Sequence, residues 1–217
     1  AQLDVKNPRK IAAALGIFDQ HVDRQDFLAR VSVTRSIRVT PLTFEYDLIQ
    51  KARSNKRHIV LAEGLEERIL RAAEILLLRG AVQLTLLGDP AQVRAKIAEL
   101  SLQLPDVAII DPQTSPQRDA FAEEYFRLRH HKGVSKQMAF DTLADVSYFG
   151  TMMVHLGFAH GMVSGAIHTT QHTIRPALEI IKTKPGTTLV SSVFFMCLHD
   201  RVLVFGDCAI IPDPTAE

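Results

Sequence analysis

The chain has 217 residues, of which 47% are hydrophobic and 23% charged, and its formal net charge is +1 at pH 7. This balance gives no bulk electrostatic attraction for nucleic acid or an anionic membrane, so any affinity for anions must be local. The longest apolar runs, such as residues 189–198, are too short to span a bilayer, and no signal-peptide pattern opens the chain. We therefore expect a cytoplasmic protein of one or two domains.

The first 40 residues differ from the rest of the chain. Residues 8–16 predict a short helix closed by Gly16, and residues 18–38 read as a connector that ends in a basic run. Pro41 then precedes a helical pattern over residues 44–52.

From residue 58 onward, predicted strands and helices alternate. The strands are expected at 58–62, 82–87 and 107–110, and the helices at 66–79, 91–100 and 115–131. The last helix is expected to start with Ser115 as N-cap and Pro116 in the first turn. This βαβαβ rhythm predicts an α/β fold with a mostly parallel sheet flanked by helices.

The second half of the chain continues with shorter elements. Ser135 and Asp145 are expected to bound further helical turns, followed by a strand and turn at 161–165, a helix at 170–184 and β-rich runs at 189–196 and 201–205. Cys197 and Cys208 lie in or next to these apolar runs without metal-type spacing, so we expect reduced thiols in the core.

A small-residue turn, a hydroxyl cluster and one arginine follow the strand at 161–165. They comprise Ser164, Gly165, His168, Thr169, Thr170, Thr173 and Arg175. Open α/β sheets bind ligands outside the carboxyl ends of their strands, and glycine lets backbone approach a ligand. Free N–H groups at a helix start, together with an arginine, can hold a phosphate-like anion. An ordinary strand–turn–helix with a surface arginine is the alternative.

Arg175 directly precedes Pro176, which restricts its backbone. Either the helix begins at Pro176 with Arg175 at its amino end, or a continuous helix kinks there. The first arrangement would aim Arg175 and the free N–H groups at one anion.

Residues 126–133 end a helix with a cluster of basic side chains and a glycine. Cations at a helix C-terminus complement the macrodipole, so a structural role is the alternative to anion binding. Arg127 and Arg129 are two residues apart and cannot both face one way.

Three further features receive weaker interpretations. The turn at 63–68 carries Glu66 and Glu67, which suit the first turn of a helix, so it is interpreted as capping. His168 and His172 have a spacing that could bind metal on a helix, but no carboxylate follows in a suitable pattern, and we expect no metal site. Asp207 is either a ligand contact or a turn residue.

Several ordered motifs resemble the phosphate acetyltransferase family from about residue 38 to residue 217. They lie at residues 60–64, 128–133, 161–166, 174–176, 189–196, 206–210 and 212–217. The first 40 residues resemble the junction that follows the regulatory domains of long bacterial members. The resemblance implies that residues 1–40 are a linker and the end of a preceding regulatory domain. Residues 41–217 would then be the N-terminal portion of the catalytic domain.

The resemblance implies a two-lobe fold of the isocitrate/isopropylmalate dehydrogenase type, with the active site between the lobes, in a homodimer. The implied reaction, in acetate metabolism, converts acetyl-CoA and phosphate to acetyl phosphate and CoA, or the reverse. CoA would be a substrate, and neither a cofactor nor a metal would be needed. The protein would supply positioning and stabilisation of the developing oxyanion.

The family's two substrate-binding arginines in this half correspond to Arg129 and Arg175. Arg175 would hold phosphate or the acyl oxygen, and Arg129 the anionic part of CoA or phosphate. The family's Ser-Arg pair and its thiol-activating aspartate have no counterpart here. Catalytic residues therefore stay unassigned, and we expect the 217-residue chain alone to be inactive. His160 and Ile211 depart from the family's usual aspartate and asparagine.

Two alternatives share the same resemblance. One is the regulatory acyl-CoA-binding domain found at the C-terminus of some malic enzymes, although the junction at 18–38 favours the transferase. The other is a phosphate butyryltransferase, because the acyl pocket cannot be read from this part of the sequence.

Overall fold

The computed structural model of the chain describes residues 7–23, 27, 39–211 and 213. Its contacts divide the chain into two compact units, one of residues 1–16 and 55–182 and the other of residues 17–54 and 183–217. Most of the expected connector, and most of the closing motif at 212–217, lie outside the described residues. The expected domain boundary near residue 40 stays a prediction.

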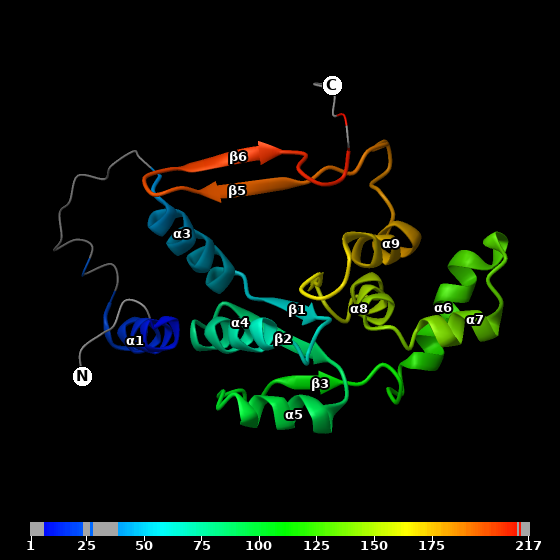
Figure 1. The fold of residues 1–217 in the computed structure, drawn as a ribbon, viewed down its shortest axis with the longest axis horizontal. Coiled ribbons are helices and arrows are strands. Elements are labelled where there is room, and N and C mark those ends of the chain that lie inside the picture. The colour runs from blue at the N-terminus through cyan, green and yellow to red at the C-terminus, as the bar shows by residue number, and fades with distance from the viewer. Residues whose placement is uncertain (1–6, 24–26, 28–38, 212, 214–217) are drawn as a thin grey trace. The chain divides into compact units, whose positions relative to one another are not determined.

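A four-stranded parallel sheet forms the centre of the larger unit (Figure 1). Its strands are β1 (Arg57–Leu61), β2 (Val82–Leu87), β3 (Ala108–Ile110) and β4 (Gly161–Val163), in the order β3–β2–β1–β4. The predicted parallel sheet is confirmed. The chain runs from β1 outward to β3 and returns with β4 on the other side of β1. The carboxyl ends of β1 and β4 therefore flank a switch point, where sheets of this kind bind ligands.

Helices and apolar side chains cover both faces of this sheet. The helices of the larger unit are α4 (Glu67–Leu78), α5 (Pro90–Glu99), α6 (Arg118–Arg129), α7 (Lys136–Thr142), α8 (Val146–His155) and α9 (Thr170–Ile180), with a 3₁₀ turn η1 (His130–Lys132). Leu61 packs in one core cluster with Leu70 of α4, whereas Val60 packs in the other with Phe149 of α8. Successive strand residues thus point to opposite, buried faces, which explains why the strands read as continuous apolar runs.

Local capping signals were reliable at two helices and wrong at a third. Ser135 accepts a hydrogen bond from the N–H of Met138, and Asp145 caps α8 in the same way, as predicted. Helix α6, however, begins at Arg118 rather than near Ser115. The N–H of Arg118 instead closes a turn onto the carbonyl of Ser115, at 3.1 Å.

Helix α1 (Pro8–His21) continues past Gly16, which corrects the predicted helix end. A Cβ atom at Gly16 would lie 3.0 Å from the carbonyl oxygen of Leu78. The glycine therefore allows a close approach to the end of α4 instead of ending a helix.

The smaller unit contains helix α3 (Pro41–Ser54) and an antiparallel hairpin of β5 (Val193–Cys197) and β6 (Val202–Gly206). The rings of Phe44 and Phe195 lie 5.1 Å apart between helix and hairpin. All residues of β5 are exposed. Cys197 and Cys208 are free thiols, as expected, but both are exposed, so their predicted core location is wrong. A two-stranded ribbon has too little packed surface to enclose them.

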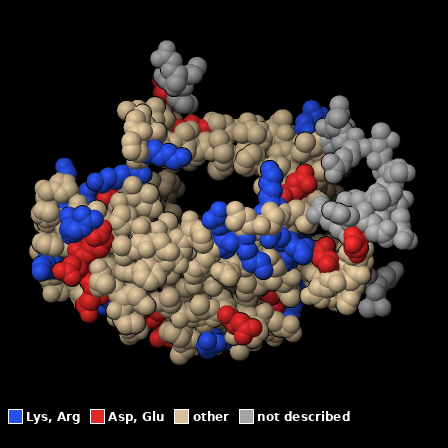
Figure 2. Space-filling view, turned by 180° about the vertical axis from the view of Figure 1, so that it is seen from behind, with Lys and Arg blue, Asp and Glu red and all other residues tan. Residues whose placement is uncertain are grey.

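Charges of both signs are interspersed over the face shown in Figure 2, in keeping with the near-neutral composition. In the part of the chain that the structure describes, no helix combines the length and the apolar character needed to cross a membrane.

Candidate functional site

The loop between β4 and α9 wraps around the carboxylate of Glu63, which follows β1. Oε2 accepts hydrogen bonds from the N–H groups of Gly165 (3.1 Å) and Ala166 (2.8 Å), and Oε1 from those of Ile167 (2.8 Å) and His168 (2.9 Å). The Glu63 side chain has 0% of its surface exposed. Gly165 has a φ of +112°, a backbone conformation that side chains disfavour, and this lets the four donors converge.

The ionisation of Glu63 follows from these bonds. Burial by itself would raise its pKa, but the four backbone donors outweigh burial and lower the pKa to about 2. The carboxylate is therefore charged at neutral pH and saturates the donors of the loop. The backbone that Gly165 was expected to bring close to a ligand thus holds an internal anion instead.

Helix α9 begins at Thr170, and Thr169 is its N-cap, with Oγ1 accepting from the N–H of His172 at 3.2 Å. Pro176 lies inside this helix. The continuous helix is thus the correct one of the two predicted arrangements, and Arg175 lies in its second turn rather than at its amino end. The hydroxyl oxygens of Ser164 and Thr173 are buried without a hydrogen-bond partner.

His168 and His172 stack with ring centroids 4.6 Å apart. His172 Nε2 lies 2.9 Å from Asp145 Oδ2, and His168 Nδ1 lies 3.0 Å from Glu63 Oε1 but outside hydrogen-bond geometry. Each ring therefore has its own acidic neighbour. Over residues 7–23, 27, 39–211 and 213, no group of three or more His, Cys, Asp or Glu side chains is arranged to hold a metal ion.

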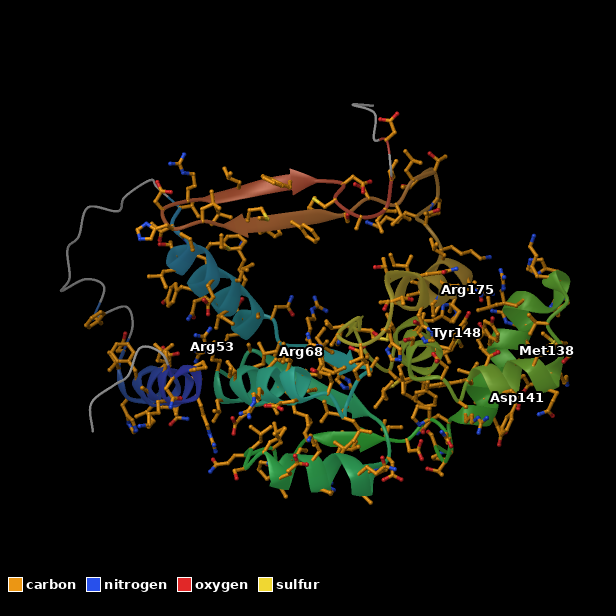
Figure 3. All side chains as sticks on the ribbon, in the orientation of Figure 1. Arg53, Arg68, Met138, Asp141, Tyr148 and Arg175 are labelled. Carbon is orange, nitrogen blue, oxygen red and sulfur yellow. The ribbon has the colours of Figure 1, made fainter. Side chains whose placement is uncertain are left out.

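Arg129 and Arg175 meet at the carboxylate of Glu179. Arg175 Nε donates to Glu179 Oε1 at 2.9 Å, and Arg129 Nη2 lies 3.7 Å from the same oxygen. The hydroxyls of Tyr125 and Tyr148 donate to Oε2 at 2.8 and 3.1 Å. We call these five residues the Glu179 cluster. They come from α6, α8 and α9, and Figure 3 shows Tyr148 and Arg175 on the last two.

Charge in the Glu179 cluster is unbalanced. Burial raises the pKa of Glu179, but the hydrogen bonds from Arg175 and the two tyrosines outweigh it, so the pKa is lowered. Burial and the neighbouring carboxylate raise the pKa of Tyr125, and the same two causes raise that of Tyr148. One carboxylate thus faces two guanidinium groups. The Arg175 side chain is 64% exposed, while Arg129 Nε is buried without a hydrogen-bond partner. The cluster can accept a further anion.

Sequence reasoning selected Arg129 and Arg175 but missed Tyr125, Tyr148 and Glu179. The spacing of Arg175 and Glu179, four positions apart on one helix, was the available signal. Nothing local indicates the tyrosines, whose contacts to Glu179 span 54 and 31 positions.

The end of α6 separates its two arginines, as expected. Arg127 pairs with Glu124 at 2.6 Å and is 68% exposed, whereas Arg129 faces Glu179. Desolvation and nearby positive charges, including those of Lys132 and Arg129, lower the pKa of His131.

The predicted capping role of the 63–68 turn is confirmed at Glu66, whose Oε2 accepts from the N–H of Ile69 at 3.1 Å. Arg68 then donates to the carbonyl of Ala166 at 2.7 Å, which ties the start of α4 to the loop around Glu63.

The two departures from the family pattern lie in ordered positions. His160 Nδ1 accepts from the N–H of His58 at 3.1 Å, next to the β1–β4 ladder. The N–H of Ile211 donates to Asp207 Oδ1, which also accepts from Ile210. Asp207 therefore holds a turn, which is one of the two roles considered for it.

Known proteins resemble the chain over most of its length. The family model described as "Phosphate acetyl/butaryl transferase" matches residues 43–217. A phosphate acetyltransferase of Synechocystis sp. is 56% identical over 210 residues, and one of Nitratidesulfovibrio vulgaris is 53% identical over 216. The alignments cover 96% and 100% of this chain, but only 30% and 31% of those proteins. The chain thus spans about a third of their length.

Solved structures show the same relationship. A phosphotransacetylase from Streptococcus pyogenes has a TM-score of 0.76 at 40% identity, over 82% of this chain and 54% of that one. The EutD phosphotransacetylase from Staphylococcus aureus has a TM-score of 0.70 at 39% identity, over 78% of this chain and 52% of that one. The parallel sheet, the ordered motifs and the extent of the family match lead to one conclusion: the chain belongs to the phosphate acetyl/butaryl transferase family.

Proposed function

We propose that the chain is part of an enzyme that interconverts acetyl-CoA plus phosphate with acetyl phosphate plus CoA. The Glu179 cluster carries this proposal, because it gathers two arginines around one carboxylate and leaves a positive charge in excess. Every substrate of the reaction bears an anionic phosphate group. The relatives named phosphate acetyltransferase support the acetyl group as the one transferred.

In the proposed reaction, the CoA thiolate attacks the carbonyl carbon of acetyl phosphate. The new C–S bond forms as the C–O bond to phosphate breaks, and the phosphate leaves with the electron pair. Arg175 would hold phosphate or the acyl oxygen, and Arg129 the anionic part of CoA or phosphate. Both act by positioning and by opposing the charge that develops on the carbonyl oxygen.

We propose that the polar residues at the start of α9 contribute further contacts to substrate. They are the side chains of Ser164, His168, Thr169 and Thr170, whereas Gly165 is left out because its N–H group donates to Glu63. CoA acts as a substrate, no cofactor takes part, and the chemical step needs no metal. The groups that activate the thiol are not assigned to this chain.

The test is an assay of acetyl phosphate formation by the full-length protein and its R129A, R175A and R127A variants. Loss of a charged donor aimed at the transition state should lower kcat/KM by about 100-fold in R129A and R175A. R127A is the matched control, because Arg127 pairs with Glu124 on the same helix as Arg129. Unchanged activity in R175A would show that the site assignment is wrong. Acyl-CoA binding without turnover by the wild type would favour the regulatory binding domain.

A butyryl group is the second candidate, because the matching family description covers both transferases. Rates with acetyl-CoA and butyryl-CoA, measured on the same preparation, separate the two. A kcat/KM that favours butyryl-CoA would reassign the acyl group while leaving the arginine roles unchanged.

We further propose a homodimer in the cytoplasm, with residues 1–40 joining residues 41–217 to a preceding regulatory domain. The resemblance to long bacterial members supports this organisation. Sedimentation of the full-length protein tests the oligomeric state.

A further inference from the structure

We define the Glu63 nest as Glu63 with the N–H groups of residues 165–168, and the reaction proposed above assigns no role to its carboxylate. We propose that Glu63 is a positioning residue. Its carboxylate would build the β4–α9 loop and so set the start of α9, the helix that carries Arg175. The functional part of this inference rests on the proposed transferase activity.

Four N–H groups that converge on one point repel each other unless an anion lies between them. In this loop the anion is supplied by the protein itself, at 2.8 to 3.1 Å from every donor. The side chain is fully buried, so water cannot take over the hydrogen bonds while Glu63 is in place. The loop conformation therefore depends on this one carboxylate.

The loop is connected directly to the residues that the reaction would use. Ser164 leaves β4 at one end, and Thr169 caps α9 at the other. Arg175 and Glu179 follow on α9, so a displaced helix start would also shift the Glu179 cluster. Arg68 also holds the loop, by donating a hydrogen bond to the carbonyl of Ala166. Among these described loop contacts, Glu63 is the only charged acceptor.

The chemistry of the acceptor distinguishes the informative substitutions. A glutamine at position 63 keeps the volume but offers one acceptor oxygen, and its NH₂ group would face N–H donors. An alanine removes all acceptors and leaves a space lined by four donors. Formate is small and bears the same carboxylate, so it can occupy that space.

The first measurement is hydrogen exchange of the amides of residues 165–168 in full-length wild type, E63Q, E63A and E67A. Glu67 is an acidic neighbour with a half-exposed side chain paired to Arg71, which makes E67A the matched control. We expect faster exchange in E63Q and faster still in E63A, with E67A like the wild type. Unchanged exchange in E63Q and E63A would overturn the anchoring role. E63Q carries the test if E63A does not fold.

The second measurement is transferase kinetics with and without formate. We expect kcat/KM to fall by about 100-fold in E63A, because the reacting groups are misplaced, with the loss mainly in kcat. Formate should restore part of this loss in E63A but not in R175A, a response that a merely structural defect would not give. Normal kinetics in an E63A protein whose loop exchanges faster would overturn the positioning role.

The two measurements keep the two proposals distinguishable. A wild type that lacks transferase activity overturns the proposed function and the kinetic role of Glu63 together. The exchange rates still decide whether Glu63 anchors the loop.

Discussion

The Glu63 nest and the Glu179 cluster are both built around one carboxylate, but their donors differ in kind. Glu63 is bound by four backbone N–H groups of one loop and has no exposed side-chain surface. Glu179 is bound by side chains from three helices, one of which, Arg175, is largely exposed. Backbone donors cannot move without moving the chain, whereas side-chain donors can exchange one anion for another. The carboxylate of Glu63 therefore fixes the conformation of a loop, whereas that of Glu179 binds a partner, Arg175, that is also exposed to solvent.

The largest expected effect concerns the acid stability of the Glu63 nest. The pKa of Glu63 is about 2 in the folded protein, against 4.5 for the ordinary group, so its contribution is complete above pH 4.5 and is lost as the pH falls towards 2. The shift corresponds to roughly 3 kcal/mol. We expect the free energy of unfolding, measured in urea, to fall as the pH is lowered from 4.5 towards 2. This fall should be larger in the wild type than in E63Q by about the same amount. An equal pH dependence of stability in the two proteins would contradict the idea that the charge of Glu63 stabilises the nest.

A smaller effect is expected from G64A, next to the nest. A Cβ atom at Gly64 would lie 2.5 Å from the carbonyl oxygen of Leu87, so the ends of β1 and β2 would have to separate. Such backbone shifts cost about 1–3 kcal/mol in the free energy of unfolding. G206A is the control, because a Cβ atom there meets nothing within 4 Å. Equal melting temperatures for both variants would contradict the expected separation of the ends of β1 and β2.

The Glu179 cluster is probed by Y125F, which removes the shorter of the two tyrosine bonds to Glu179. A hydrogen bond to a buried charged group contributes about 1.5–3 kcal/mol, and we expect the lower end because Arg175 and Tyr148 remain. Y148F, with its 3.1 Å bond, should cost less. Chemical denaturation of both variants checks the order, and the reverse order would mean that burial, not the bond, sets the contribution.

The smallest effect is expected from R127A. Arg127 forms an exposed ion pair with Glu124 on one helix, and solvent screening leaves such pairs little effect on stability. We expect a change in melting temperature close to the error of calorimetry, and no change in phosphate affinity. A loss of phosphate affinity comparable to that of R129A would extend the anion site to the opposite side of α6.

Local signals predicted much of the fold. The strands, the caps at Ser135 and Asp145 and the capping role of Glu66 depend on neighbours within a few positions, and the structure confirms them. Gly16 was misread because its reason is a contact with Leu78 of another helix, which no local pattern encodes.

The candidate site was predicted only in part, because some of its contacts also join residues that are far apart in the chain. The resemblance selected Arg129 and Arg175, and the structure brings them to one carboxylate. The loop at 164–170 reads as an anion cradle, and its backbone donors do hold an anion. That anion belongs to Glu63, about a hundred positions earlier in the chain. Sequence patterns report the geometry of a donor set but not which acceptor the fold brings to it.

The Glu63 nest also has a consequence for the order of folding. Its hydrogen bonds join residues 102 to 105 positions apart, and β1 and β4 must lie side by side before the carboxylate can reach the loop. Contacts of such high sequence separation carry a loop-closure entropy that local contacts do not, and they slow folding. We therefore expect the nest to close late, after α4 has packed on β1 and β2, and the edge of the sheet next to the β4–α9 loop to be among the last parts to become native.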